Sequence, residues 1–77
     1  MPKFPVLTAK QVIAVLKKLG FAEDRQKGSH LVLINLNTRA RTIVPIHHGK
    51  TINRFLLKGI IDDAKVTDET FFSLFRK

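Results

Sequence analysis

The sequence predicts an α+β fold, with elements in the order α-β-β-β-α-α and the helices packed on one face of a three-stranded antiparallel sheet. Apolar residues recur at helical spacing near both ends of the chain, whereas the middle holds short apolar or β-branched runs separated by turn residues. No helix separates these runs, so the strands are expected to pair as a meander with one face under the helices. Residues 1–77 are too few for two hydrophobic cores, and a single domain is expected.

The first helix is expected over residues 9–19. Thr8 and Gln11 have the spacing of a capping box, in which the Thr hydroxyl accepts a hydrogen bond from a backbone amide and the Gln side chain reaches back. An apolar stripe follows on one side of the helix. Gly20 can then take the left-handed conformation that ends it.

Three strands are expected in the middle of the chain, at Phe21–Gln26, Leu31–Leu36 and Arg41–Val44. Lys27-Gly28 and Asn37-Thr38 supply the turns between them. Pro45 lacks an amide donor, which places the third run at a sheet edge or near a strand end. Both alternating sets of side chains in the second run are largely apolar, so the sequence leaves open which sheet face carries His30.

Two helices are expected after the sheet. Thr51 can cap the first of them, which continues through Ala64 and places Phe55 and Leu56 on a broad apolar face. Thr67 can cap the last helix, whose first turn holds two acidic residues, as the helix dipole favours.

The charge of the chain favours a polyanionic partner. The 14 Lys and Arg residues exceed the 6 Asp and Glu residues, which gives a formal net charge of +8, and nucleic acid is the expected partner. The window from Arg25 to Ile61 holds no acid, and its basic residues are Arg25, Lys27, Arg39, Arg41, Lys50, Arg54 and Lys58. The second and third strands carry no aromatic residue to stack on bases, so contacts to the RNA backbone are expected.

Composition also excludes several classes of protein. The chain has no cysteine, which excludes disulfides and thiolate zinc sites and fits a cytoplasmic protein. No stretch approaches the roughly 18 apolar residues of a membrane span, so no membrane association is expected. His47 and His48 point in opposite directions in an extended segment and have no nearby acid, so neither a metal site nor another cofactor is expected.

His30 is the candidate catalytic residue. An imidazole that is neutral at pH 7 can take the proton of a ribose 2′-hydroxyl, which DNA lacks, and this chemistry needs no metal. The candidates for holding the phosphate beside it are the cations Arg25 and Lys27 and the small residues Gly28 and Ser29. The alternative is a structural histidine at a strand end, hydrogen-bonded and inert.

Three later residues extend the candidate RNA-binding set, namely Arg41, His47 and Lys50. Arg41 and Lys50 belong to the acid-free window. His47 can supply a proton to a leaving group, contact a phosphate, or be a surface histidine with neither role, and the sequence leaves these alternatives open.

The chain resembles the HicA toxins, also called YcfA-like proteins. The residues that carry the likeness are Pro5-Val6, Thr8, Lys10, Leu19-Gly20-Phe21, the run from Arg25 to His30, and Pro45-Ile46-His47, followed by Lys50, Ile52, Leu57, Lys58, Ile60 and Ile61, and by Ala64, Thr67, Glu69 and Phe71 in the last helix. Each short motif is weak alone, whereas their order and spacing along nearly the whole chain are fairly specific.

The resemblance implies a fold like that of double-stranded-RNA-binding domains. It also implies a metal-independent endoribonuclease, an mRNA interferase, that a HicB antitoxin neutralises. His30 matches the catalytic histidine of the family. Two departures are present: Phe55-Leu56 stands where the family commonly has Gly-Thr, and Lys65 stands where it usually ends the helix with Gly.

Two other functions fit the same residues. A non-catalytic RNA-binding module would use the basic surface with His30 making only a hydrogen bond, and a DNA-binding domain would use it without a helix-turn-helix motif. A sheet face left open by the helices would suit a protein partner, either an antitoxin or a second copy of the chain.

Overall fold

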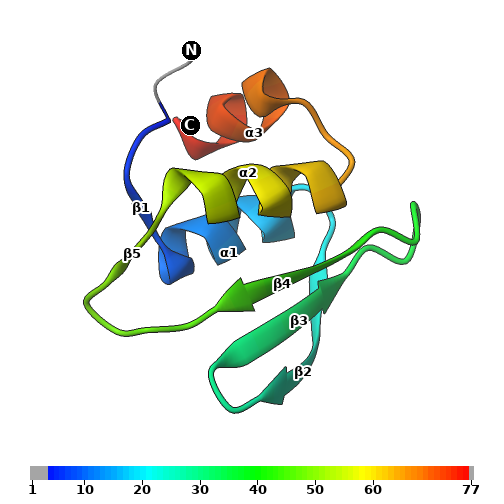
Figure 1. The fold of residues 1–77 in the computed structure, drawn as a ribbon. Helices are drawn as coiled ribbons and strands as arrows, with labels where there is room; N and C mark the ends of the chain where they lie inside the picture. The colour runs from blue at the N-terminus through cyan, green and yellow to red at the C-terminus, as the bar shows by residue number, and fades with distance from the viewer. Residues whose placement is uncertain (1–3, 77) are drawn as a thin grey trace.

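The structure is a computed structural model that describes residues 4–76. Its elements are β1 (Leu7–Thr8), α1 (Ala9–Lys18), β2 (Ala22–Lys27), β3 (His30–Ile34), β4 (Arg41–Pro45), β5 (Thr51–Ile52), α2 (Arg54–Asp63) and α3 (Asp68–Phe75). Strands β2, β3 and β4 form an antiparallel sheet in that order, and the three helices lie together on one side of it (Figure 1). The predicted fold class is therefore confirmed.

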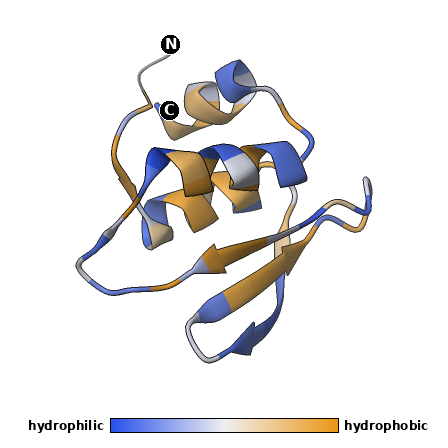
Figure 2. Ribbon diagram, in the orientation of Figure 1, coloured by the Kyte–Doolittle hydropathy of each residue, from blue (hydrophilic) through white to orange (hydrophobic). Residues whose placement is uncertain are grey.

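The hydrophobic core lies between the helices and the inner face of the sheet. Its fully buried side chains come from every layer: Val12 and Leu16 of α1, Leu33 of β3, Val44 of β4, Leu57, Ile60 and Ile61 of α2, and Phe71 of α3. Figure 2 shows this as apolar colour on β3, on β4 and along α1, whereas β2 is hydrophilic. Burial of these apolar surfaces supplies the stability of a fold that has no cysteine to form a disulfide.

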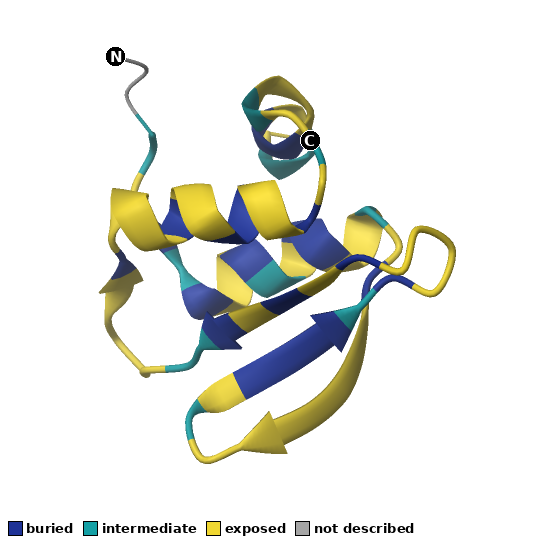
Figure 3. Cartoon of the chain, turned by 45° about the vertical axis from the view of Figure 1, so that its right-hand side comes forward, coloured by how far each residue is buried: buried dark blue, intermediate teal, exposed yellow. Residues whose placement is uncertain are grey.

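Strand β2 contributes little to this core. All six of its residues are exposed, as the yellow strand in Figure 3 shows, whereas β3 beside it is mostly buried. The ladder between them shifts register between Glu23 and Arg25. Charged side chains and such an irregularity discourage pairing of an edge strand with another chain.

Strand β3 ends earlier than the sequence predicts. Asn35 is buried, and its side-chain amide donates to the Leu19 carbonyl at 3.1 Å while its side-chain oxygen accepts from the amide of Asn37 at 2.9 Å. These bonds turn the chain, so the predicted run to Leu36 stops at Ile34 and Leu36 is 82% exposed.

The helix α2 begins later than predicted, because Thr51 does not cap it. Thr51 and Ile52 form β5, which pairs antiparallel with β1, so that Ile52 lies opposite Leu7. Asn53 caps the helix instead, its side-chain oxygen accepting from the amide of Leu56 at 2.8 Å. The prediction missed this two-stranded sheet because each strand has only two residues and its partner lies far away in sequence.

The apolar face of α2 is narrower than predicted. Leu57, Ile60 and Ile61 are buried at helical spacing, whereas Phe55 is 75% exposed and Leu56 is 39% exposed. Arg54 covers part of the Phe55 ring, with its guanidinium carbon 5.4 Å from the ring centroid. Of the broad apolar face that the sequence predicts, Phe55 and Leu56 are therefore left exposed.

The remaining helix ends match the sequence patterns. Thr8 and Gln11 form the complete capping box of α1, and the Thr67 hydroxyl accepts from the amide of Thr70 at 3.1 Å to cap α3. Lys65 follows α2 with a φ of 61°. This lysine takes the left-handed conformation that glycine usually supplies, at a cost of about 1–2 kcal/mol.

Candidate active site

His30 lies on the sheet face that points away from the helices. Leu31 and Leu33 belong to the core, and because side chains alternate along a strand, His30 and Val32 point to the opposite face. His30 is exposed, and its ring makes no hydrogen bond to any other residue between 4 and 76. The structure thus places this imidazole in contact with water, which a general base for an external substrate requires.

A tight hairpin turn holds His30 beside a cation. Gly28 and Ser29 alone separate Lys27 from His30, which pair directly across β2 and β3. Gly28 has a φ of 57°, the left-handed conformation that tight hairpin turns demand and that glycine adopts without steric cost. Directly opposite residues in an antiparallel pair share a sheet face, so Lys27 and His30 are neighbours on the open face.

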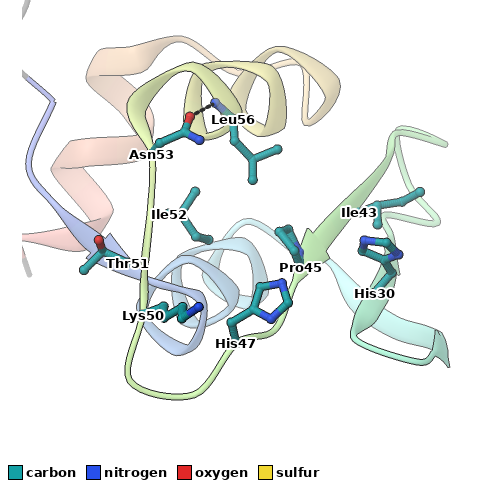
Figure 4. A pocket seen from close by; sticks show the side chains of 9 residues that line it. All are labelled: His30, Ile43, Pro45, His47, Lys50, Thr51, Ile52, Asn53 and Leu56. Carbon is teal, nitrogen blue, oxygen red and sulfur yellow. Dashed lines mark hydrogen bonds between the residues drawn. The ribbon is translucent and has the colours of Figure 1, made fainter.

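The other side of His30 opens into a cleft of about 510 Å³ between the end of β4 and the start of α2. The residues that line it are His30, Ile43, Pro45, His47, Lys50, Thr51, Ile52, Asn53 and Leu56 (Figure 4). His30 and His47 lie on either side of Pro45, and Lys50 comes from the same loop as His47. Two imidazoles and an ammonium group thus border one cavity; we name it the first cleft.

Backbone hydrogen bonds fix the loop that carries His47 and Lys50. The amide of Ile46 donates to the carbonyl of Ser29 at 2.6 Å, and the amide of Lys50 donates to the carbonyl of His47 at 3.1 Å. The first bond ties the start of this loop to the hairpin turn that precedes His30. Both histidines are therefore positioned from the same end of the sheet.

Some of the predicted site residues lie away from the first cleft. Arg25 pairs with Val32, the next position along the open face from His30, and its Nε lies 3.2 Å from Asp24 Oδ2, which neutralises part of its charge. Gly28 and Ser29 shape the turn but do not line the cleft. Among the predicted residues, Lys27 pairs directly with His30 in the ladder, and His47 and Lys50 line the same cleft as His30.

Arg41 lies at the opposite end of the sheet. It pairs with Ile34, whereas His30 pairs with Pro45. The two pairs are four positions apart along the strand, about 13 Å at the usual rise per residue. Arg41 therefore does not line the first cleft.

Sequence reasoning missed the wall of the first cleft that comes from the start of α2. Asn53, Thr51 and Leu56 line it, and Asn53 also caps the helix. An asparagine before an apolar helical run is a recognised cap signal and was the available clue. The wall itself depends on β5, which brings the start of α2 next to the end of β4.

Two further findings concern metal-binding groups and membrane-spanning helices. Within residues 4–76 no group of three or more His, Cys, Asp or Glu side chains is placed to hold a metal ion. None of the helices formed by these residues combines the length and apolarity needed to cross a membrane.

Comparison with known families gives a match over most of the chain. A model of the family described as HicA toxin of bacterial toxin-antitoxin matches residues 9–66, from the first residue of α1 to beyond the end of α2. The matched segment contains both histidines of the first cleft. A search of the curated proteins gave no match.

Proposed function

This chain belongs to the HicA toxin family of bacterial toxin–antitoxin systems, and on that premise we propose that it is an endoribonuclease that cleaves messenger RNA without a metal ion. One observation supports this most strongly. His30 is exposed on the open face of the sheet, has Lys27 opposite it, and borders a cleft together with His47 and Lys50.

The proposed reaction begins with His30 acting as a general base. It takes the proton of the ribose 2′-hydroxyl, and the 2′-oxygen forms a bond to the adjacent phosphorus while the bond from phosphorus to the 5′-oxygen breaks. The products are a 2′,3′-cyclic phosphate end and a 5′-hydroxyl end, so no water or metal ion enters this step. Removal of a general base costs roughly 10²–10⁴ in rate.

The 5′-oxygen needs a proton as it leaves, and the proposal assigns this role to His47. It borders the same cleft as His30 from the far side of Pro45. A protonated imidazole can first contact the phosphate and then transfer the same proton to the departing oxygen. In this proposal His47 therefore both contacts the phosphate and supplies the proton to the leaving group.

The cations act on the phosphate itself. Lys27 lies opposite His30 and Lys50 lines the cleft that His30 borders, and in this proposal both cations stabilise the charge that develops on the phosphoryl oxygens. Arg25 contributes less, because Asp24 offsets its charge. Amide and hydroxyl groups of Gly28 and Ser29 can bind a neighbouring phosphate, and Arg41 attracts the strand over a longer range.

A toxin of this family has an antitoxin as its partner protein, and we propose an antitoxin of the HicB type. Ile43, Phe55 and Leu56 are exposed apolar side chains at or near the first cleft. A protein that covered them would also block access to His30. A second copy of the chain could use the open face in the same way, and the oligomeric state measured by light scattering decides between the two.

The experiment that tests the reaction uses metal-free protein and a labelled RNA in the presence of a chelator. The expected result is cleavage that leaves 2′,3′-cyclic phosphate ends. An RNA with a 2′-deoxyribose at the cleavage position should remain uncut. Shifted but uncut RNA would contradict catalysis and would indicate a binding module. Cleavage at a 2′-deoxy position would contradict attack by the 2′-oxygen.

A further inference from the structure

A second cleft adjoins the first, on the α1 side of the loop from Ile46 to Lys50. It encloses about 640 Å³, and α1 supplies one wall with Lys10, Ile13 and Lys17. His47 and Lys50 line both clefts. The two clefts therefore adjoin at these two residues, and a strand that crosses His47 and Lys50 can reach both.

The lining of the second cleft suits a nucleotide. Its acid, Glu23, is bound to Lys17 with Nζ 2.7 Å from Oε2, so this pair contributes little net charge. Lys10 and Lys50 are exposed, and neither makes an ion pair among residues 4–76. The half-buried Ile13 gives an apolar surface beside these cations. A nucleotide offers the complementary groups, an anionic phosphate and the flat face of a base.

We propose that the second cleft binds the part of the RNA strand that lies 3′ of the cut, with Lys10 contacting its phosphate. The direction of the strand rests on the proposed function. If His30 takes the proton of the 2′-hydroxyl, the nucleotide 5′ of the cut lies at His30, and the nucleotide that carries the leaving 5′-oxygen lies at His47. Because His47 borders the second cleft, the strand continues from there past Lys50 toward Lys10.

The test compares three RNA substrates that share one cleavage site: a dinucleotide, a version extended on its 3′ side and a version extended on its 5′ side. For the parent protein, the 3′ extension should raise kcat/KM over the dinucleotide. Lys10→Glu should reduce that value roughly tenfold for the 3′-extended substrate, the effect of about one charged hydrogen bond, and leave the dinucleotide unchanged. The variant should fold, since an acid in the first turn of α1 suits the helix dipole.

Lys65→Glu is the matched control. Lys65 is exposed, follows the far end of α2 and lines neither cleft, so this variant makes the same change in net charge without touching the proposed site. It should cleave all three substrates as the parent does. A loss of kcat/KM that both variants share comes from the change in the net charge of the protein and not from the second cleft.

Several results would overturn the proposal. They are no gain from the 3′ extension, an equal loss on all three substrates with Lys10→Glu, or a loss confined to the 5′-extended substrate. Unchanged cleavage of every RNA together with weaker antitoxin binding would instead assign the cleft to a protein partner. Failure of the proposed function is distinct, because the parent protein would then leave all three substrates uncut.

Discussion

His30 lies directly opposite Pro45 in the ladder between β3 and β4. Because the chain leaves the sheet at Pro45, His47 follows only two residues later and borders the same cleft as His30. The bond from the Ile46 amide to the Ser29 carbonyl, 2.6 Å long, fixes this exit. Strand pairing thus brings two imidazoles that are 17 residues apart in sequence to one cavity.

The assignment of His47 as proton donor predicts a selective rescue. His47→Ala should lower cleavage of ordinary RNA by roughly 10²–10⁴. An RNA with sulfur in place of the bridging 5′-oxygen releases a thiolate, which needs no proton, because thiols are far more acidic than alcohols. His47→Ala should cleave this RNA at close to the parent rate, whereas His30→Ala should not. An equal loss on both RNAs would leave His47 only a phosphate contact.

Lys50 should contribute through its charge. Lys50→Gln should lower kcat/KM, and the slope of log affinity against log salt concentration should fall by about one, the value for a lost phosphate contact. Lys65→Gln removes the same charge away from both clefts and should leave both quantities unchanged. If the two variants behave alike, Lys50 acts only through net charge.

Two glycines should respond to alanine in opposite directions. Gly28 has a φ of 57°, and no heavy atom lies within 4 Å of an added Cβ, so Gly28→Ala should cost about 1 kcal/mol in unfolding free energy from the backbone conformation alone. Gly59 lies inside α2 with equal space around it. Gly59→Ala should therefore stabilise the protein by about 1 kcal/mol. Chemical denaturation measures both changes in unfolding free energy. An unchanged stability of Gly28→Ala would contradict the claim that this turn position favours glycine.

Lys58 joins α2 to α3 and is expected to affect stability without affecting cleavage. Its hydrogen bond to Asp68 at 3.0 Å, and then its bond to Asp62 at 3.1 Å, raise the pKa of this lysine. A raised pKa means that the stabilisation is fully present below the ordinary lysine pKa of about 10.4 and is lost as pH rises through the higher folded value.

The thermal midpoint of Lys58→Gln should therefore lie below that of the parent between pH 7 and 10. The two midpoints should converge at higher pH and at high salt, since the pair is exposed. Cleavage of RNA should be unchanged. A difference in midpoint that persists above the lysine titration would show that packing, and not charge, accounts for the effect.

Local patterns in the sequence were sufficient for the order of β2, β3 and β4 and for the helix caps of α1 and α3. Thr8 has Gln11 at capping-box spacing, and Thr67 stands directly before two acids of the first helical turn, so local signals predict both caps. The pairing of Leu7 with Ile52 could not be predicted in this way, because two-residue strands carry no periodicity. That pairing moved the start of α2 and created the Asn53 wall of the first cleft.

The face on which His30 lies also depends on tertiary packing. Val32, on the open face, is as buried as Leu31 on the inner face, at 5% and 4% exposure. The hydrophobicity of the side chains in β3 therefore did not show which sheet face meets the helices. The distinction comes from the helices, which pack on the side of Leu31 and Leu33.

The general-base role of His30 is tested most directly by its replacement. Metal-free parent and His30→Ala proteins should be compared on one labelled RNA, with Leu36→Ala, an exposed loop substitution beyond β3, as the control. His30→Ala should fold and bind RNA like the parent but cleave it roughly 10²–10⁴ times more slowly, while Leu36→Ala cleaves normally. Parent-like cleavage by a folded His30→Ala protein would contradict the mechanism.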